Sequence, residues 1–470
     1  MENKYKNSYN LLQNDLKNKI LMLDGAMGTM IQRENLTAED FGGEKYEGCN
    51  DYLVLKRPDI IKNIHKKYLE AGSDIIETNS FGALEIVLKD YDLEDKVFEM
   101  NKRAAELVNE AIAEYRSEHP EVTRNLYVAG ALGPSNKSIS VTGGVTFEEL
   151  INNYYTAVSG LLAGGADLIL FETIQDTRNL KAAYLGLKKA MKENYTVPLM
   201  LSFTIESTGT TLAGQTADAF YYAVNHMNPF SVGLNCATGP EFMTQFLKTL
   251  NDISNTYISV YPNAGLPNED GEYEETPVTL ANKLEPFFKN KYLNIVGGCC
   301  GTTPDYIKEI KEKTVNYEPR NIDKNKNFNN LSGLISLETP KDRPIYVGER
   351  TNVIGSRIFK NLIAQEKFDE ATEVARLQIK GDADVIDVCL ANPDRDEVAD
   401  MKAFLEKVSK FAKVPIMLDS TDINVVEKGL TYLQGKGIIN SINLEDGEEK
   451  FKKMAEVIKE FGAAVVVGLI

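Results

Sequence analysis

Three cysteines follow apolar segments that end in turns rich in glycine, threonine and proline. Cys236 lies in SVGLNCATGP, and the adjacent Cys299 and Cys300 lie in NIVGGCCGTTP. Each apolar segment is typical of a strand, so the sulfur atoms are expected at strand ends, where loops can expose them. Three thiolates together predict a site for a soft metal. Two alternatives stay open: a single strand-end cysteine is often a small buried residue, and the adjacent pair could form a disulfide.

Zinc held by three cysteines would keep a fourth coordination position open, as catalytic zinc sites do. Such a centre carries a net charge of about −1 and is a poor Lewis acid for water, but it suits a substrate thiol, whose pKa falls on coordination. Alkylation of that sulfur would give a thioether, which binds zinc weakly and leaves. Asn263 ends the segment between the two cysteine segments and is expected to offer a weak oxygen ligand when substrate is absent.

Eight short apolar segments alternate with longer amphipathic ones and are expected to position these cysteines. They are ILMLDGAMG, DIIETNSFG, LYVAGALGP, DLILFETIQ, PLMLSFTIES, SVGLNCATG, YISVYPNAG and LNIVGGCCG. Stretches such as KVFEMNKRAAELVNEAIAEYR have apolar residues at three- and four-residue spacing, which predicts helices between the strands. Eight such units in about 300 residues favour a closed (β/α)8 TIM barrel over an open doubly wound sheet. No GxGxxG follows the first strand, which weakens the nucleotide-binding alternative.

A barrel of this kind carries its active site at the carboxyl ends of its strands. Strands six and eight flank strand seven, so Cys236 and the cysteine pair should converge on one arc of the rim. The polar residues and cysteines at these ends are Asp24, Glu77, Asn79, Glu172, Glu206, Cys236, Asn263, Cys299 and Cys300. The histidines compete poorly as ligands, because His65 and His119 lie in charged helical contexts and His226 lies in a predicted loop. Neither a Ser-His-Asp arrangement nor a phosphate-binding P-loop is visible.

Composition bounds the class of protein. A chain of 470 residues with 43% hydrophobic residues predicts two domains with substantial cores. The net charge of −17 argues against nucleic acid or an anionic membrane surface as the main partner. Five cysteines are too few for a disulfide framework and indicate a reducing compartment. The sequence has neither an export signal nor an apolar run of about 18 residues, so a cytoplasmic location is expected.

The amino-acid composition of the chain changes near residue 320. A polar segment rich in Asn, Lys and Pro predicts a linker over residues 321–342, between a first domain at 1–320 and a second at 343–470. In the second domain, strand-like runs alternate again with helical segments: IYVGERTN, DVIDVCLANPD, PIMLDST, IINSINLEDG and AAVVVGLI. The order is again strand, helix, strand.

Five motifs of the first domain carry a family resemblance. LDGAMGTMIQ, DIIETNSFGA, ILFETIQDTRNLKAA, GLNCATGP and GGCCGTTPDYI resemble, in order and spacing, the barrel of homocysteine S-methyltransferases over residues 10–320. The resemblance implies a methyltransferase in which Cys236, Cys299 and Cys300 bind Zn²⁺ and homocysteine's thiolate displaces Asn263 before methylation to methionine. It also implies that Asp24 and Glu172 bind the substrate ammonium group. A strand-end carboxylate suits that role. Glu77 is expected to lie next to Asp24 and Glu172 and to support this substrate site.

The second domain resembles the pterin-binding barrel of cobalamin-dependent methionine synthases. The similarity rests on GERTN at 348–352, MLDS at 417–420 and NSIN at 440–443. It implies a folate pocket lined by Glu349, Asn352, Asp419 and Asn440. It further implies methyltetrahydrofolate as the methyl source and methylcobalamin as the carrier, bound by a cobalamin-binding domain in cis or in trans.

The sequence departs from this second pattern in three ways. Cys389 follows the IDV of the second strand where the family has Asn, and it reads as a small buried residue. The last run reads as about the fifth strand of the second (β/α) barrel that the resemblance implies, so that barrel is expected to be truncated. We expect either a fragment of a longer chain or a barrel completed by another polypeptide. A cobalamin-type GxxxHDxG pattern is absent.

Two alternative functions remain open. One is a stand-alone homocysteine methyltransferase with a sulfonium or betaine-type donor. The other is a non-catalytic zinc or thiol carrier for a corrinoid partner.

Overall fold

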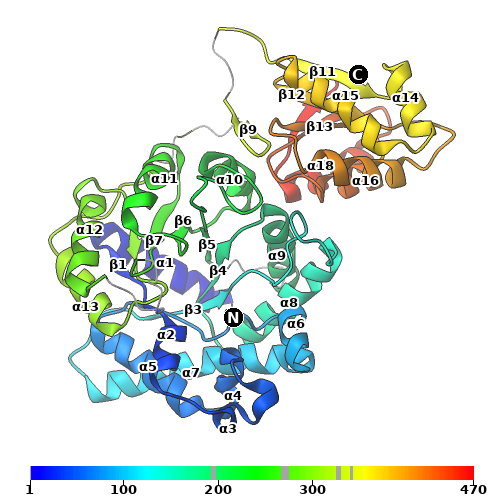
Figure 1. The fold of residues 1–470 in the computed structure, drawn as a ribbon. Coiled ribbons are helices and arrows are strands. Elements are labelled where there is room, and N and C mark those ends of the chain that lie inside the picture. Colours follow the sequence, from blue (N-terminus) through cyan, green and yellow to red (C-terminus); the bar gives the residue numbers. More distant parts are fainter. Residues whose placement is uncertain are drawn as a thin grey trace. The chain divides into compact units, whose positions relative to one another are not determined.

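The chain forms two compact units, drawn in sequence colours in Figure 1. The computed structural model describes residues 2–191, 197–265, 275–323, 326, 330–338 and 342–469. The first unit comprises residues 1–175, 182–212 and 229–326, and the second comprises 176–181, 213–228 and 327–470. The strands of the first unit form one parallel sheet, and five later strands form another in the second unit.

The first sheet is a closed eight-stranded barrel, as the alternation of apolar segments predicted. Its neighbours follow the order β1-β8-β7-β6-β5-β4-β3-β2, and a parallel bridge between Leu23 and Ile75 joins β1 to β2. Every predicted strand is present. The strands are β1 (Leu21–Met22), β2 (Ile75–Glu77), β3 (Tyr127–Leu132), β4 (Leu168–Ile174), β5 (Leu199–Phe203), β6 (Ser231–Asn235), β7 (Tyr257–Tyr261) and β8 (Ile295–Val296).

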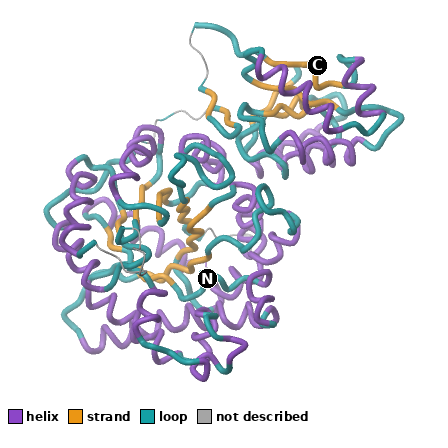
Figure 2. Tube along the Cα trace, viewed as in Figure 1, coloured by secondary structure: helices purple, strands orange, loops and turns teal. Residues whose placement is uncertain are grey.

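Helices surround the orange strands of this barrel in Figure 2. The longer helices bury a row of apolar residues, as the three- and four-residue spacing predicted. Their bounds are α1 (Glu2–Asn18), α2 (Met27–Arg33), α3 (Ala38–Phe41), α4 (Leu53–Lys56), α5 (Pro58–Ala71), α6 (Glu85–Leu88), α7 (Val97–Glu118), α8 (Phe147–Ala163), α9 (Thr177–Ala190), α11 (Pro240–Ile253), α12 (Pro277–Lys289) and α13 (Pro304–Thr314). Helix α10 (Ala217–Val224) belongs to the second unit.

Helix α1 precedes the barrel and was not anticipated from the sequence. Its Leu12 and Leu16 are buried and belong to the same core cluster as Leu21 and Tyr257, which begin β1 and β7. The helix therefore covers the amino-terminal end of the barrel, and the carboxyl ends of the strands remain available for a site.

The second sheet has five parallel strands in sequence order, β11-β12-β13-β14-β15. All five predicted runs form strands: β11 (Val347–Asn352), β12 (Val385–Cys389), β13 (Ile416–Asp419), β14 (Ile438–Ile442) and β15 (Ala464–Val467). The helices between them are α14 (Arg357–Ala364), α15 (Phe368–Lys380), α16 (Glu397–Val408), α17 (Ile423–Leu430) and α18 (Glu448–Phe461). All four strand pairs are parallel, with register shifts between Gly348 and Thr351 and between Asn440 and Ile442, and this order of five strands is consistent with a truncated second barrel.

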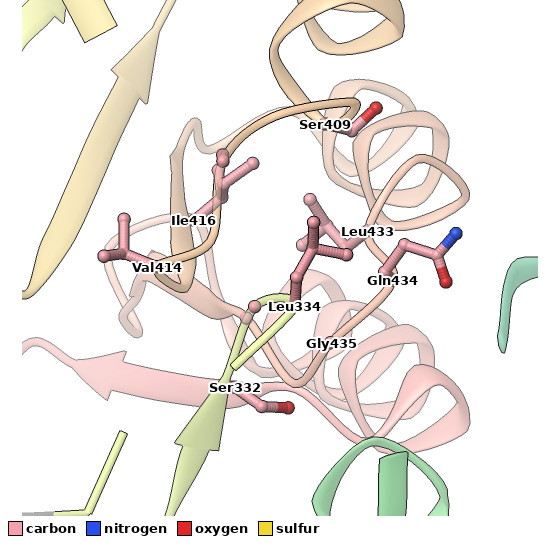
Figure 3. Close-up of a pocket in the computed structure, with 11 residues that line it drawn as sticks. Ser332, Leu334, Ser409, Val414, Ile416, Leu433, Gln434 and Gly435 are labelled. Carbon is pink, nitrogen blue, oxygen red and sulfur yellow. The ribbon is translucent and has the colours of Figure 1, made fainter. Parts of the chain in front are cut away.

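A short hairpin, β9 (Leu331–Ser332) and β10 (Ser336–Leu337), packs under the amino-terminal end of the second sheet. Ser332 N donates to Lys436 O at 3.1 Å, and Ile335 N donates to Lys413 O at 3.1 Å. Figure 3 shows the small cavity beside this hairpin, about 20 Å³ in volume. Its lining is mostly apolar, so it reflects packing at the end of the sheet away from the strand-end residues.

Among the residues that the structure describes, no helix is long and apolar enough to cross a bilayer.

Candidate active site

A cavity of about 350 Å³ opens at the carboxyl ends of the barrel strands. It brings together most of the strand-end residues singled out in the sequence. Those that line it are Asp24, Glu77, Asn79, Glu172, Cys236, Cys299 and Cys300. Glu206 does not line this cavity. It lies in a turn in which its backbone N donates to Thr210 O at 2.8 Å. Asn79 donates to Asn50 O at 2.8 Å and so fixes the loop that forms one wall.

Cys236, Cys299 and Cys300 place their sulfur atoms within 4.8 Å of one another. Hydrogen bonds from Cys299 and Cys300 lower the pKa of Cys236 to about 3. Donating these hydrogen bonds raises the pKa of Cys299 and of Cys300. Backbone bonds hold the strand ends that carry them, since Cys299 N donates to Pro262 O at 2.8 Å. The cysteines therefore converge on one point although they come from different strands.

Gly298 lets the cysteine pair turn sharply after β8. A Cβ on Gly298 would lie 2.3 Å from Thr302 Oγ1, so the position has no room for a side chain. Thr302 in turn donates to Cys299 O at 2.6 Å. The GGCC sequence thus packs its backbone against a threonine that fixes the carbonyl of the first cysteine.

The donor set fits a tetrahedral zinc ion. Sulfur atoms around one zinc lie about 3.8 Å apart, a spacing that three sulfurs within 4.8 Å can reach with small side-chain shifts. Asn263 lies near enough to lower the pKa of Cys236, and its Oδ1 is buried with no hydrogen-bond partner among the described residues. A buried, unpartnered oxygen beside three sulfurs is what a weak fourth ligand requires.

Three carboxyl groups face the same cavity from β1, β2 and β4. Glu77 N donates to Asp24 Oδ2 at 3.1 Å, whereas Asp24 Oδ1 and Glu77 Oε1 have no partner within the described part of the chain. Burial raises the pKa of Asp24 and of Glu77, and burial together with the charge of Cys236 raises the pKa of Glu172 to about 8. Unpartnered buried carboxyls favour a cationic ligand, because an ammonium group would satisfy them.

Asn235 joins the carboxylate and cysteine parts of the site, a role that sequence analysis missed. Its Oδ1 accepts from Thr173 N at 3.1 Å and from Ser202 Oγ at 2.6 Å, and its Nδ2 donates to Thr173 Oγ1 at 2.8 Å. Thr173 directly follows Glu172, and Asn235 directly precedes Cys236. The sequence signal was an amide residue at the end of a mostly apolar strand.

Left-handed backbone conformations concentrate at the same two strand ends. Thr173 has φ of 53°, Cys236 of 60° and Ala237 of 53°. Such conformations cost on the order of 1–3 kcal/mol each in non-glycine residues and persist only where surrounding contacts hold them. Here the Asn235 hydrogen bonds hold Thr173, so the strain lies beside the residues that face the cavity.

The second sheet has a polar row at the carboxyl ends of its strands. The pairing aligns Asn352 with Cys389, and Asp419 with Asn440. Asn352 Nδ2 lies 3.2 Å from Asp387 Oδ2 and 3.4 Å from Asp419 Oδ2.

Asp387 was not singled out in the sequence, yet it is buried and its Oδ1 lacks a partner among the described residues. Burial raises its pKa to about 6. Glu349, on the same strand as Asn352, is exposed.

The remaining cysteines and histidines lie apart from the three-sulfur cluster. Cys49 and Cys389 are buried, and burial raises the pKa of each to about 12. His65 is fully buried in α5, and His119 pairs with Glu121 at 3.4 Å. His226 follows α10 in a short helical turn.

The fold and the cavity define a class: a (β/α)8 barrel with a thiol cluster and a carboxyl cluster at one rim. The chain belongs to the homocysteine S-methyltransferase family, whose model matches residues 21–314, more than half of its length. The pterin-binding enzyme family matches residues 348–470. This order of two domains corresponds to the N-terminal part of methionine synthase.

Solved structures agree with the barrel fold. The homocysteine methyltransferase MmuM from Escherichia coli, in an oxidized form, aligns at 23% identity with a TM-score of 0.52, covering 63% of this chain and 96% of that one. Its metallated form aligns at 24% identity with the same TM-score, covering 63% and 97%. At these identities the likeness concerns the fold.

Proposed function

We propose that the first barrel binds homocysteine and activates its thiol for methylation to methionine, as in methionine synthase. One observation carries the proposal: a single cavity joins three clustered sulfur atoms to three buried carboxyl groups. A substrate that satisfies both ends needs a soft donor atom and a cationic group in one small molecule. Homocysteine has a thiol and an ammonium group three carbons apart.

Cys236, Cys299 and Cys300 would hold Zn²⁺, with Asn263 Oδ1 as the fourth ligand at rest. When bound there, zinc supplies an open position that lowers the pKa of a substrate thiol and keeps its sulfur nucleophilic. The chain's own part is to hold three sulfurs at one point through the backbone bonds of β6, β7 and β8. Three thiols this close stay reduced in a reducing compartment, so we place the protein in the cytoplasm.

Asp24 and Glu172 would bind the substrate ammonium group, with Glu77 beside them. All three side chains are desolvated, and a charge-assisted hydrogen bond is strongest in such surroundings. The Asn235 network would keep this end of the cavity at a constant distance from Cys236. That distance would select an amino acid whose thiol is two methylenes from its α-carbon.

The polar row of the second sheet would bind the pterin ring of methyltetrahydrofolate through Glu349, Asn352, Asp419 and Asn440. Carboxylate and amide groups match the donors and acceptors of that ring. The methyl group would then reach homocysteine through methylcobalamin on a cobalamin-binding domain in cis or in trans. Titration of methyltetrahydrofolate into wild type and Asp419→Asn tests the pocket: weaker binding by the variant is expected, and equal binding would contradict it.

Metal analysis combined with a methylcobalamin:homocysteine methyl transfer assay tests the main proposal. Wild type should hold about one zinc per chain and produce methionine, whereas Cys299→Ala should lose both. Cys49→Ala is the matched control, because Cys49 is buried outside the cluster. Full zinc and full activity in Cys299→Ala would refute the assignment. Turnover of S-methylmethionine without a corrinoid would point to a sulfonium donor instead, and zinc and homocysteine binding without turnover would point to a carrier.

A further inference from the structure

Tyr261 is a buried tyrosine that lines the active-site cavity. It ends β7, two residues before Asn263, and only 1% of it is exposed. Its ring belongs to the barrel core cluster, together with Tyr257 on the same face of the strand. Its hydroxyl group has no hydrogen-bond partner among the described residues.

Tyr261 lines the same cavity as the carboxyl groups of Glu77 and Glu172. Its strand, β7, pairs with β6 and β8, and the cysteines follow the ends of these two strands. The hydroxyl of Ser202, on β5, is already used, because it donates to Asn235 at 2.6 Å.

A buried hydroxyl without a partner is unfavourable by on the order of 1–3 kcal/mol. Phenylalanine would fill the same core volume without that penalty, so packing alone does not explain a tyrosine here. A hydroxyl that faces a cavity can instead complete its hydrogen bonding on a ligand. Tyr257, by contrast, begins the strand, packs its ring against Phe230 at 5.0 Å and does not line the cavity.

We infer that Tyr261 is a specificity-determining residue whose hydroxyl hydrogen-bonds the α-amino-acid end of the bound thiol substrate. This inference rests on the proposed homocysteine site and adds a contact to it. The hydroxyl can accept from the ammonium group and donate to a carboxylate, and Tyr261 lines the same cavity as Glu172 and Glu77, where that ammonium is proposed to lie. It thereby favours thiols that carry an amino acid group over simple alkanethiols.

Calorimetric titration of the zinc-loaded protein with homocysteine and with 1-propanethiol tests this contact. Propanethiol has the same carbon chain up to the α-carbon but lacks the ammonium and carboxylate groups. Tyr261→Phe should bind homocysteine about tenfold more weakly than wild type and propanethiol equally well, with an unchanged zinc content. Tyr257→Phe is the matched control and should bind both thiols as wild type does.

Two results would overturn the inference while leaving the proposed function intact. One is unchanged homocysteine binding by Tyr261→Phe. The other is an equal loss of affinity for homocysteine and for propanethiol, or a loss of zinc, because either would show that the hydroxyl has a structural role. Zinc-loaded wild type that fails to bind homocysteine would overturn the proposed function and this inference together.

Discussion

At the scale of single residues, the cavity combines two kinds of unsatisfied group. Asp24, Glu77 and Asn263 each keep a buried oxygen without a partner among the described residues, and hydrogen bonds among three clustered sulfur atoms lower the pKa of Cys236. A protein core normally pairs such groups. Their concentration at one rim is therefore best explained by ligands that complete them.

Glu172→Gln tests the carboxyl end of this site. The substitution keeps the size of the side chain and removes its ability to ionise against the ammonium group, so the KM for homocysteine should rise about ten- to a hundredfold with little change in zinc content. Steady-state kinetics with metal analysis would measure both. Glu206→Gln serves as the control because Glu206 also follows a strand but does not line the cavity. Equal effects of the two substitutions would argue against an ammonium contact at Glu172.

The positions of Asp24, Glu172 and the three cysteines at strand ends could be predicted, because turn residues follow an apolar run at each of them. Asn235, Tyr261 and Asp387 could not. Each is a polar residue of a mostly apolar strand, and whether its side chain faces the sheet's site, the helices or solvent depends on how the sheet twists and pairs.

At the scale of elements, the apolar runs predicted all eight strands of the barrel and all five of the second sheet. Parallel strands buried on both faces leave this signal in almost any context. Helix α1 has a weaker signal in the sequence, because Leu12 and Leu16 lie among Asn, Gln and Lys residues. Its burial depends on the barrel end that it covers, which local sequence does not reveal.

Gly298→Ala tests how the turn after β8 positions the cysteine pair. The new Cβ would clash with Thr302 at 2.3 Å, so the turn must shift, at a cost of about 1–3 kcal/mol in the free energy of unfolding. Zinc content should fall with it. Gly28→Ala is the control, because a Cβ there meets nothing within 4 Å. Urea unfolding and metal analysis would measure both effects, and normal zinc in Gly298→Ala would contradict this role of the glycine.

At the scale of the whole molecule, stability should depend on pH through His65. This side chain is fully buried in α5 with neither ring nitrogen paired within the described residues, and burial lowers its pKa to about 3. The unfolded chain binds a proton near pH 6.5, so unfolding takes up a proton between pH 6.5 and 3. The contribution of His65 to the free energy of unfolding is therefore largest above pH 6.5 and falls as the pH drops through this window.

His65→Leu should remove this dependence. At pH 5 the buried histidine costs about 2 kcal/mol, so the variant should gain about that much relative to wild type between pH 7.5 and pH 5. Urea unfolding at the two pH values measures the difference. His119→Leu, at an exposed histidine, should leave it unchanged. The same pH dependence in His65→Leu and wild type would show that other groups control acid stability.

The central claim is that the three cysteines hold a zinc ion whose fourth position accepts the substrate sulfur. X-ray absorption at the zinc edge, with and without homocysteine, measures this directly. The account predicts three sulfur neighbours and one nitrogen or oxygen neighbour at rest, and four sulfur neighbours once homocysteine is added. A zinc environment that gains no sulfur on addition of homocysteine would contradict it.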